Sequence, residues 1–268
     1  MSHKILTSTE IVLVCGGKGG VGKSTVAVNL AALLARTDLQ PQVGLLDADL
    51  QGPSIPTMLG LSGRPKVIQG KIQPVALNGL KIMSTGLLAS PEQTFAWKGP
   101  LLRGALKQML RDVAWGDLDV LIIDTPPGTG DLHLALMALV DVAGVVVVTT
   151  PQRVALADTR RCMTMLRLMG VPFRAVVQNM SYFVCPHCET RASVFDHGGH
   201  GSVSSLLAAE VDVPIYELPI LSAIAEHGDS GLPIVDTQAG RDAGLPQIFA
   251  RIATSALSEG FSNIDVDT

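Results

Sequence analysis

Aromatic and charged residues are both scarce in this chain of 268 residues. Aromatic side chains make up 4% of it and charged ones 16%, with a formal net charge of −4. So few aromatics and so little excess positive charge argue against a surface that stacks bases or follows a phosphate backbone. Hydrophobic residues, by contrast, reach 47%, which is far too many for a disordered chain. These proportions predict a globular protein that has no nucleic-acid partner.

Long apolar runs and targeting signals are also missing. The longest apolar stretches, such as Ala143 to Val148, are much shorter than the ~20 residues of a membrane helix. The first ten residues, MSHKILTSTE, lack the apolar segment of a signal peptide. Four cysteines, at positions 15, 162, 185 and 188, are too few for a disulfide framework. We therefore expect a cytoplasmic protein that does not bind membranes.

Short aliphatic runs alternate with longer helical patterns along the chain. The expected strands are 11–15, 43–47, 80–84, 120–124, 144–149, 174–178 and 214–218. The expected helices are 23–36, 100–113, 131–140, 154–169, 201–209, 221–228 and 244–258. Several strands are apolar throughout, which is typical of parallel strands covered on both faces. The pattern predicts an α/β fold, a mostly parallel sheet flanked by helices on both faces, as a single domain over 1–268 with frayed tails at 1–9 and 259–268.

A glycine-rich loop carries the strongest chemical signal. Residues 17 to 24 match G-x-x-x-x-G-K-[ST], directly after an expected strand and before an expected helix. Glycines let successive backbone N–H groups turn toward one anion, and the helix N-terminus adds a partial positive charge. Lys23 is expected to reach the β- and γ-phosphates of ATP, and the Ser24 hydroxyl to bind Mg²⁺. The expected cradle consists of Gly17, Lys18, Gly19, Gly20, Val21, Gly22, Lys23, Ser24 and Thr25.

A second lysine, Lys18, lies earlier in the same loop and cannot take the role of Lys23. An isolated loop lysine is usually only solvated, but a cation here would stabilise phosphate oxygens. We expect it to reach the nucleotide of a partner subunit across a dimer interface. The stretch KGGVGKST resembles the deviant Walker A motif. Division-site ATPases, plasmid-partition ATPases, the nitrogenase iron protein and Mrp-type iron–sulfur carriers share that motif, so it does not choose between them.

Acidic and amide side chains follow three of the expected strands, at the sheet edge where open α/β proteins bind ligands. Asp124 ends the apolar run VLIID as a Walker B aspartate does, and we expect it to hold Mg²⁺ through water. The resemblance implies that Asp49 orients the attacking water and that Asp47 supports Mg²⁺ from outside its direct ligands. Asp47 could instead cap a turn. The resemblance also implies that Asn179 recognises adenine, with a simple turn asparagine as the alternative.

A Cys-Pro-His-Cys sequence follows the strand of Asn179. Together with DADLQGPSIPTMLG and DTPPGTGD, this segment closely resembles the Mrp family of iron–sulfur cluster carrier ATPases, over residues 8–257. Glu189 and Gln178 depart from the residues common in that family without removing a functional group. Thiolates are soft ligands, and a [4Fe–4S] cluster needs about four of them. One chain offers only Cys185 and Cys188 beyond two cysteines expected in the core, so a homodimer would complete the set.

Other assignments of the cysteine pair stay open from the sequence. With His197 and His200 the pair forms C-x2-C-x8-H-x2-H, which could close a zinc site within one chain. The pair also has the spacing of a dithiol oxidoreductase, or its members could be ordinary free cysteines. For the whole protein the alternatives are a positioning ATPase of the division-site or partition type with a structural zinc loop, and a small-molecule kinase.

The family resemblance implies a slow, switch-like ATPase that uses ATP and Mg²⁺. Its predicted catalytic residues are Lys18, Lys23, Asp49 and Asp124. In this prediction ATP closes a homodimer and sets the geometry of a bridging [4Fe–4S] cluster held by Cys185 and Cys188. Hydrolysis then reopens the dimer and changes its affinity for the cluster. The expected partners are a cluster donor and the apo iron–sulfur proteins that receive the cluster.

Overall fold

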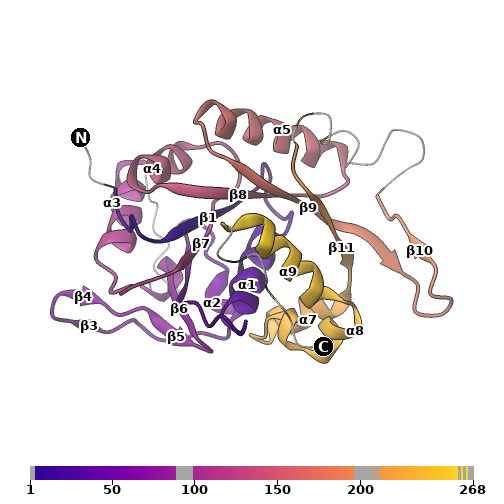
Figure 1. The fold of residues 1–268 in the computed structure, drawn as a ribbon, viewed down its shortest axis with the longest axis horizontal. Coiled ribbons are helices and arrows are strands. Elements are labelled where there is room, and N and C mark those ends of the chain that lie inside the picture. The colour runs from indigo at the N-terminus through magenta and orange to yellow at the C-terminus, as the bar shows by residue number, and fades with distance from the viewer. Residues whose placement is uncertain are drawn as a thin grey trace.

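A mostly parallel sheet runs through the centre of the computed structural model, which describes residues 4–88, 99–195, 207, 210, 212–258, 261 and 264 (Figure 1). Within these residues the sheet has the order β10-β9-β8-β1-β7-β2-β6-β5, and β11 pairs with β9. Only the outer pairs β5–β6 and β9–β10 are antiparallel. The strands are β1 (Glu10–Cys15), β2 (Val43–Asp47), β5 (Val75–Leu77), β6 (Leu80–Ser84), β7 (Val120–Asp124), β8 (Val142–Thr149), β9 (Phe173–Val184), β10 (Arg191–Ala192) and β11 (Ile215–Ile220).

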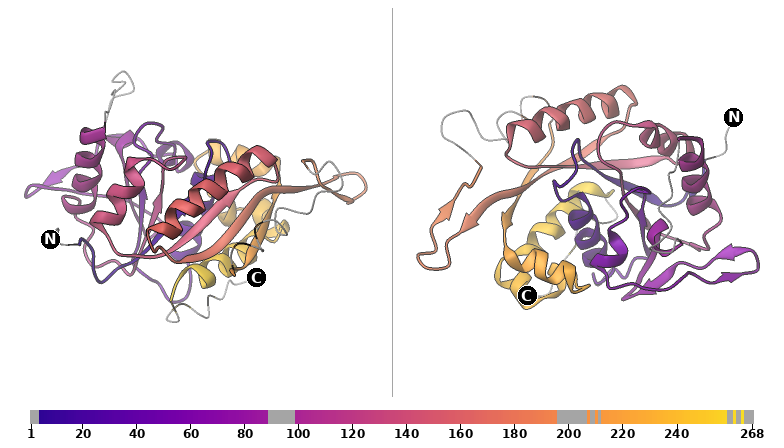
Figure 2. Two further views of the ribbon diagram at one scale, coloured as in Figure 1. Left: turned by 90° about the horizontal axis from the view of Figure 1, so that it is seen from above. Right: turned by 180° about the vertical axis from the view of Figure 1, so that it is seen from behind.

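Helices cover both faces of this sheet, as Figure 2 shows. One face packs against the helices α1 (Lys23–Leu34), α7 (Ser222–Asp229), α8 (Gln238–Asp242) and α9 (Leu245–Ala256). The other face packs against α3 (Gly99–Arg111), α4 (Asp131–Leu139) and α5 (Arg153–Leu168). Successive side chains of a strand point to opposite faces, so Val12 lies in the first core and Leu13 in the second. The apolar strands are therefore explained by burial on both sides.

The register of the central strands brings the candidate acids together. β2 and β7 are parallel neighbours, and Asp47 lies directly opposite Asp124. β1 pairs with the other side of β7, so that Val14 is also beside Asp124. The glycine-rich loop leaves the end of β1 and enters α1, which begins at Lys23. The loop and both acids therefore meet at one edge of the sheet.

The predicted α/β fold is confirmed, and the main strands lie close to their expected positions. The expected helix at 201–209 lies outside the described residues except for Leu207. The sequence pattern does not predict the short elements α2 (Ile55–Met58), β3 (Val67–Ile68), β4 (Lys71–Ile72), β5, β10, α8 and the 3-10 helices at Thr85–Leu87 and Ile234–Asp236. The strand expected to end at Gln178 continues to Val184 as β9.

Some described residues of both expected tails contact the body of the molecule, and the fraying of 1–9 and 259–268 stays a prediction. The backbone N–H of Ile5 donates to the carbonyl of Leu139, and the Lys4 ammonium donates to the carbonyl of Val140. Residues 4 and 5 are therefore held against the end of α4. At the other end, Phe261 and Ile264 pack against the core, and most of 259–268 lies outside the described residues. No helix in the described residues is both long and apolar enough to cross a membrane.

Candidate functional site

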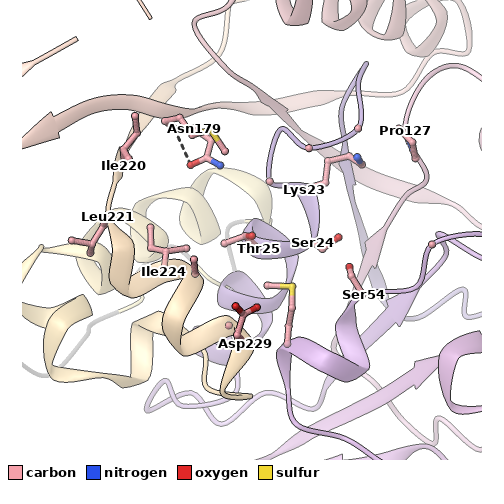
Figure 3. A pocket seen from close by; sticks show the side chains of 18 of the residues that line it. Lys23, Ser24, Thr25, Ser54, Pro127, Asn179, Ile220, Leu221, Ile224 and Asp229 are labelled. Atoms are coloured by element: carbon pink, nitrogen blue, oxygen red, sulfur yellow. Dashed lines mark hydrogen bonds between the residues drawn. The ribbon is translucent and has the colours of Figure 1, made fainter. Parts of the chain in front are cut away.

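A cavity of about 660 Å³ opens beside the glycine-rich loop (Figure 3). At one end Figure 3 shows Lys23, Ser24 and Ser54, and at the other Asn179 and Leu221. The wall is polar where it is built by the loop and largely apolar where it is built by Met180 of β9, the end of β11 and the start of α7. The lining residues singled out in the sequence are Gly19, Gly20, Gly22, Lys23, Ser24, Thr25, Asp49 and Asn179. A cavity with one polar and one apolar end fits a ligand that carries phosphates on an apolar body.

The loop needs its glycines for two physical reasons. Gly20 and Gly22 have φ of 79° and 95°, a left-handed backbone that side chains disfavour. A Cβ on Gly17 would lie 2.1 Å from the backbone carbon of Asp158 in α5, so only glycine permits this close approach. The Lys23 side chain folds back over the loop, and its ammonium donates to the carbonyl of Lys18 at 3.4 Å. The loop thus curls around the Lys23 ammonium, which is bonded to a carbonyl of the loop itself. Its binding of phosphates stays a prediction.

Asp124 is a buried carboxylate without a hydrogen-bond partner among the described residues. It is fully buried, and neither of its carboxylate oxygens has a hydrogen-bond partner among the described residues. Burial raises its pKa to about 7, against the opposing effects of the Ser24 hydroxyl and the Lys23 ammonium. A buried carboxylate without a partner is costly unless a cation accompanies it. Together with the Ser24 hydroxyl it forms an oxygen donor set of the kind that Mg²⁺ prefers.

Asp47 is occupied by the protein itself. Its carboxylate accepts hydrogen bonds from the Ser84 hydroxyl at 3.0 Å and from the backbone N–H groups of Ile55 and Asp49 at 3.3 and 3.2 Å. Burial and the nearby charge of Asp124 raise its pKa to about 8. The turn-capping alternative therefore describes real contacts, because Asp47 organises the loop after β2 and the start of α2. Its expected support of Mg²⁺ stays a prediction.

Asp49 and Lys18 lie differently with respect to the cavity. Asp49 is part of the cavity wall, and its carboxylate accepts from the backbone N–H of Gly52 at 3.2 Å. Lys18 is exposed at the tip of the loop and does not belong to the described wall. Asp49 could therefore contact a nucleotide bound in the cavity of its own protomer. Lys18 points to solvent, where a second molecule can meet it.

Asn179 ties β9 to the glycine-rich loop. Its amide group donates to the carbonyl of Val21 at 2.9 Å, and its carbonyl oxygen accepts from the backbone N–H of Met180 at 2.9 Å. A Cβ on Gly22 would lie 2.2 Å from the Asn179 amide nitrogen. The side chain lies in the cavity wall beside the loop, so base recognition would compete with these bonds or add to them.

The cysteine pair lies at the tip of the β9–β10 hairpin, which extends away from the body of the molecule (Figure 1). The turn is closed by hydrogen bonds from Cys185 N–H to the Thr190 carbonyl and from Glu189 N–H to the Cys185 carbonyl. Cys185 is half-buried and Cys188 is exposed. Hydrogen bonds with Thr190, and then the Cys185 side chain, lower the pKa of the Cys188 thiol. A lowered pKa favours the thiolate, which is the form that binds metal.

The other two cysteines are in the core, as predicted. Cys15 and Cys162 are both fully buried. Burial raises the pKa of both thiols, that of Cys162 to about 11. Inert thiols of this kind do not compete for a metal. No group of three or more His, Cys, Asp or Glu in the described part of the chain is arranged to hold a metal, and His197 and His200 of the predicted zinc alternative lie outside it.

The family model described as ParA, NUBPL iron-transfer P-loop NTPase, matches residues 7–256. The chain belongs to this NUBPL family. An iron–sulfur cluster carrier protein from Synechocystis is 47% identical over 236 residues, 85% of this chain and 65% of that protein. The iron–sulfur cluster transfer protein NUBPL of Mus musculus is 41% identical over 234 residues, 87% of this chain and 72% of that protein. This NUBPL-family chain thus spans less than two thirds of the Synechocystis relative.

Solved structures agree with the family. A nucleotide-binding protein from Archaeoglobus fulgidus, in complex with ADP, has a TM-score of 0.71 and 37% identity, covering 85% of this chain and 88% of that one. The cell division ATPase MinD of Pyrococcus furiosus has a TM-score of 0.65 at 21% identity, covering 92% and 97%, which shows a common fold. The predicted P-loop NTPase fold and the predicted family of iron–sulfur carriers are both confirmed.

Several residues that line the cavity could not be recognised as candidate site residues from the sequence. They are Met58, Met180, Phe195, Pro219, Ile220, Leu221, Ile224 and Asp229. None of them belongs to a phosphate-binding motif, so no local pattern marks them. One signal was available, because a loop that follows a parallel strand lies at the same sheet edge as the other ligand loops. The expected strand at 214–218 therefore placed residues 219–221 beside the glycine-rich loop.

Proposed function

We propose that this NUBPL-family protein is an ATP-dependent carrier of iron–sulfur clusters. It binds a [4Fe–4S] cluster between two copies of the chain and transfers it to apo iron–sulfur proteins. The observation that carries the proposal is the position of Cys185 and Cys188. They lie at the exposed tip of a hairpin whose first strand, β9, also forms part of the nucleotide cavity. Relatives named as cluster carrier and cluster transfer proteins support the same role.

The number of thiolates supports a shared site. A [4Fe–4S] cluster takes about four cysteine ligands, whereas each chain offers two accessible ones, since Cys15 and Cys162 are buried. Two hairpins that meet at a two-fold axis supply the full set. A cluster held between two exposed turns can be loaded by a donor protein and released to a recipient. The cytoplasm suits such a site, because its reducing conditions keep thiols free.

In this proposal the protein hydrolyses ATP slowly, and hydrolysis switches the carrier between two states that differ in their affinity for the cluster. Lys23 would hold the β- and γ-phosphates, Ser24 and Asp124 would hold Mg²⁺, and Asp49 would orient the attacking water. When bound, Mg²⁺ supplies positive charge to the phosphate oxygens. Asn179 and the apolar cavity wall would receive the adenosine part of ATP. Lys18, exposed at the loop tip, would reach the phosphates of the partner subunit's nucleotide and so link hydrolysis to dimer contacts.

Anaerobic reconstitution with ferrous iron and sulfide tests the proposal. We expect about four iron and four sulfide ions per two chains, with the loaded protein migrating as a dimer. Cys185→Ala and Cys188→Ala should each abolish loading, whereas His187→Ala, which changes an exposed side chain between them, should not. Unchanged loading in either cysteine variant contradicts the proposal. So does a monomer that holds one zinc and loses it in His197→Ala.

A further inference from the structure

The outgoing strand of the cysteine hairpin begins at the nucleotide cavity. Asn179 and Met180 in β9 both line the cavity, and the Asn179 amide is bonded to the Val21 carbonyl of the glycine-rich loop. From there β9 runs on to Val184, and Cys185 opens the turn. A ligand that displaces this part of the wall therefore pushes directly on the first limb of the hairpin.

The returning limb leads back to the same cavity. In the β9–β10 pairing, Ala192 lies opposite Phe183. When this antiparallel register is continued by three residues, Phe195 comes opposite Met180. Phe195 is indeed a lining residue of the cavity. Both limbs of the hairpin thus end in the wall of the nucleotide site, and the cysteine turn lies at their far end.

The strand β9 is interrupted where it passes the cavity. Its pairing with β11 joins Glu217 to Gln178 and then Pro219 to Tyr182, so β9 carries two extra residues between these pairs. Met180, in the middle of the interruption, has a left-handed φ of 55°. Bulges of this kind redirect a strand and break its ladder of hydrogen bonds. The end of β11 pairs with the hairpin again at Tyr182 and Phe183. The hairpin can therefore pivot here only together with that end of β11, while the pairs up to Gln178 stay in place.

A cluster of side chains joins the two limbs of the hairpin at its base. The Arg191 guanidinium stacks over the Tyr182 ring, 3.6 Å from its centroid, and forms an ion pair with Glu217. The Glu217 carboxylate also accepts from the side-chain amide of Gln178 at 3.4 Å. Arg191 lies on the returning limb and Tyr182 on the outgoing one, so the stack fastens the two limbs together. A displacement of either limb is then passed to the turn that holds the thiols.

We propose that Phe195 is the residue through which a bound nucleoside base sets the position of the Cys185–Cys188 turn, with Arg191 fastening the two limbs so that they move together. An aromatic ring in the wall offers a base a flat apolar face to stack on. Inorganic phosphates carry no flat ring that could stack on this face. The use of the movement to control a cluster rests on the proposed carrier function, but the movement itself does not.

Thiol alkylation in the cluster-free protein tests the proposal. Iodoacetamide is added without ligand, with Mg²⁺–ADP, or with Mg²⁺–pyrophosphate, and modification of Cys185 and Cys188 is followed by mass spectrometry. A ligand shifts a conformational equilibrium only through its different affinities for the two states, and we expect ADP to change the rate by about threefold or more. Pyrophosphate should leave the rate unchanged. The buried Cys15 and Cys162 serve as internal controls for unfolding.

Variants show whether the effect of ADP on the thiols passes through Phe195 and Arg191 or follows from nucleotide binding in general. In Phe195→Ala, saturated with ADP as checked by calorimetry, the thiol rate should no longer respond to ADP. Phe195→Leu, which keeps an apolar side chain, gives the same test if the alanine variant folds poorly. Arg191→Ala should also lose the response, whereas Arg251→Ala should keep it. Arg251 is the matched control because it lies over another ring, Tyr216, with 5.3 Å to its centroid.

Besides an absent ADP response in the unaltered protein, two results would overturn the proposal. One is an equal change of the thiol rate with pyrophosphate, because the base would then be irrelevant. The other is a full ADP response in a Phe195 variant. Neither result bears on whether the protein loads a cluster, which the reconstitution experiment decides. A normal cluster load with an absent ADP response would therefore disprove only the link through Phe195.

Discussion

The buried side chain of His133 should make the free energy of unfolding depend on pH. It lies in the first turn of α4, fully buried, and neither ring nitrogen has a hydrogen-bond partner among the described residues. Burial lowers its pKa from 6.5 to about 4. As the pH falls below 6.5, the unfolded chain takes up this proton while the folded chain does not. The free energy of unfolding should therefore fall between pH 6.5 and 4, by up to about 3 kcal/mol from this group.

The variant His133→Gln should have a flatter stability profile, because glutamine has no proton to gain in this range. Urea denaturation at pH 7.0, 5.5 and 4.5 measures the difference between the two proteins. The wild type should lose more stability than the variant between the first and the last pH. His187→Gln, at an exposed position, should follow the wild type. Parallel profiles for the wild type and His133→Gln would contradict the prediction.

Gly17 and Gly19 lie in one loop but have different surroundings. An added Cβ would meet the α5 backbone at 2.1 Å on Gly17, and no described atom within 4 Å on Gly19. Gly17→Ala must push the loop away from α5 and should lower the free energy of unfolding by about 1–3 kcal/mol. Gly19→Ala should change it by less than about 0.5 kcal/mol plus its small backbone effect. Equal losses in thermal or urea unfolding would show that the contact with α5 is not the cause.

At the scale of elements, the central strands could be predicted because their burial is visible in the sequence. β2 (VGLLD) and β7 (VLIID) are apolar runs that end in aspartate, β6 (LKIMS) is apolar apart from Lys81 and its final serine, and the bounds of all three match the prediction. The final residues of β9 could not be predicted in this way. Their sequence, NMSYFV, has no strand pattern, and the strand continues because β10 and β11 pair with it. Such pairing is a long-range property that a local pattern does not contain.

The candidate site was likewise predictable only in part. The phosphate-binding residues are contiguous in the glycine-rich loop, and the acids end apolar strands, so local patterns reveal both. Phe195 and Ile224 come from segments without a motif, and they reach the cavity only through the hairpin register and the placement of α7. The capping contacts of Asp47 with Ile55 and Ser84 also join separate segments. The apolar end of the cavity therefore had to be learned from the structure.

Asn29 joins α1 to the segment that precedes α8. Its side chain donates to the Thr25 carbonyl at 2.8 Å and accepts from the backbone N–H of Val235 at 3.2 Å, in a buried position. Asn29→Ala leaves this buried N–H without a partner, which should cost about 1–3 kcal/mol of unfolding free energy. Urea denaturation measures the loss. Gln108→Ala, an exposed change on α3, should cost less than about 0.5 kcal/mol, and an equal effect of both variants would contradict the assignment.

At the scale of the whole molecule, one strand joins the two sites that the proposed function uses, the cavity and the cysteine turn. β9 connects the wall of the nucleotide cavity to the cysteine turn, so a single protomer contains a path from nucleotide to thiol. The same protomer lacks two things that the proposed function needs, namely two more thiolates for the cluster and a second lysine at its own phosphates. In the proposed function, one event would supply both, namely the meeting of two copies that each present Lys18 and the cysteine turn.

Lys18→Ala tests whether ATP-driven dimerisation and hydrolysis depend on this lysine. Lys18 is exposed and lies outside the described cavity wall, so the variant should bind ADP with a Kd within about twofold of the wild type. With ATP it should remain a monomer by light scattering, and phosphate release should fall by on the order of 10³-fold, as for other cations supplied in trans. Lys66→Ala, which removes an exposed lysine next to β3, should change neither property. If Lys18→Ala still dimerises and hydrolyses ATP at the wild-type rate, the charge of Lys18 does not act across the interface.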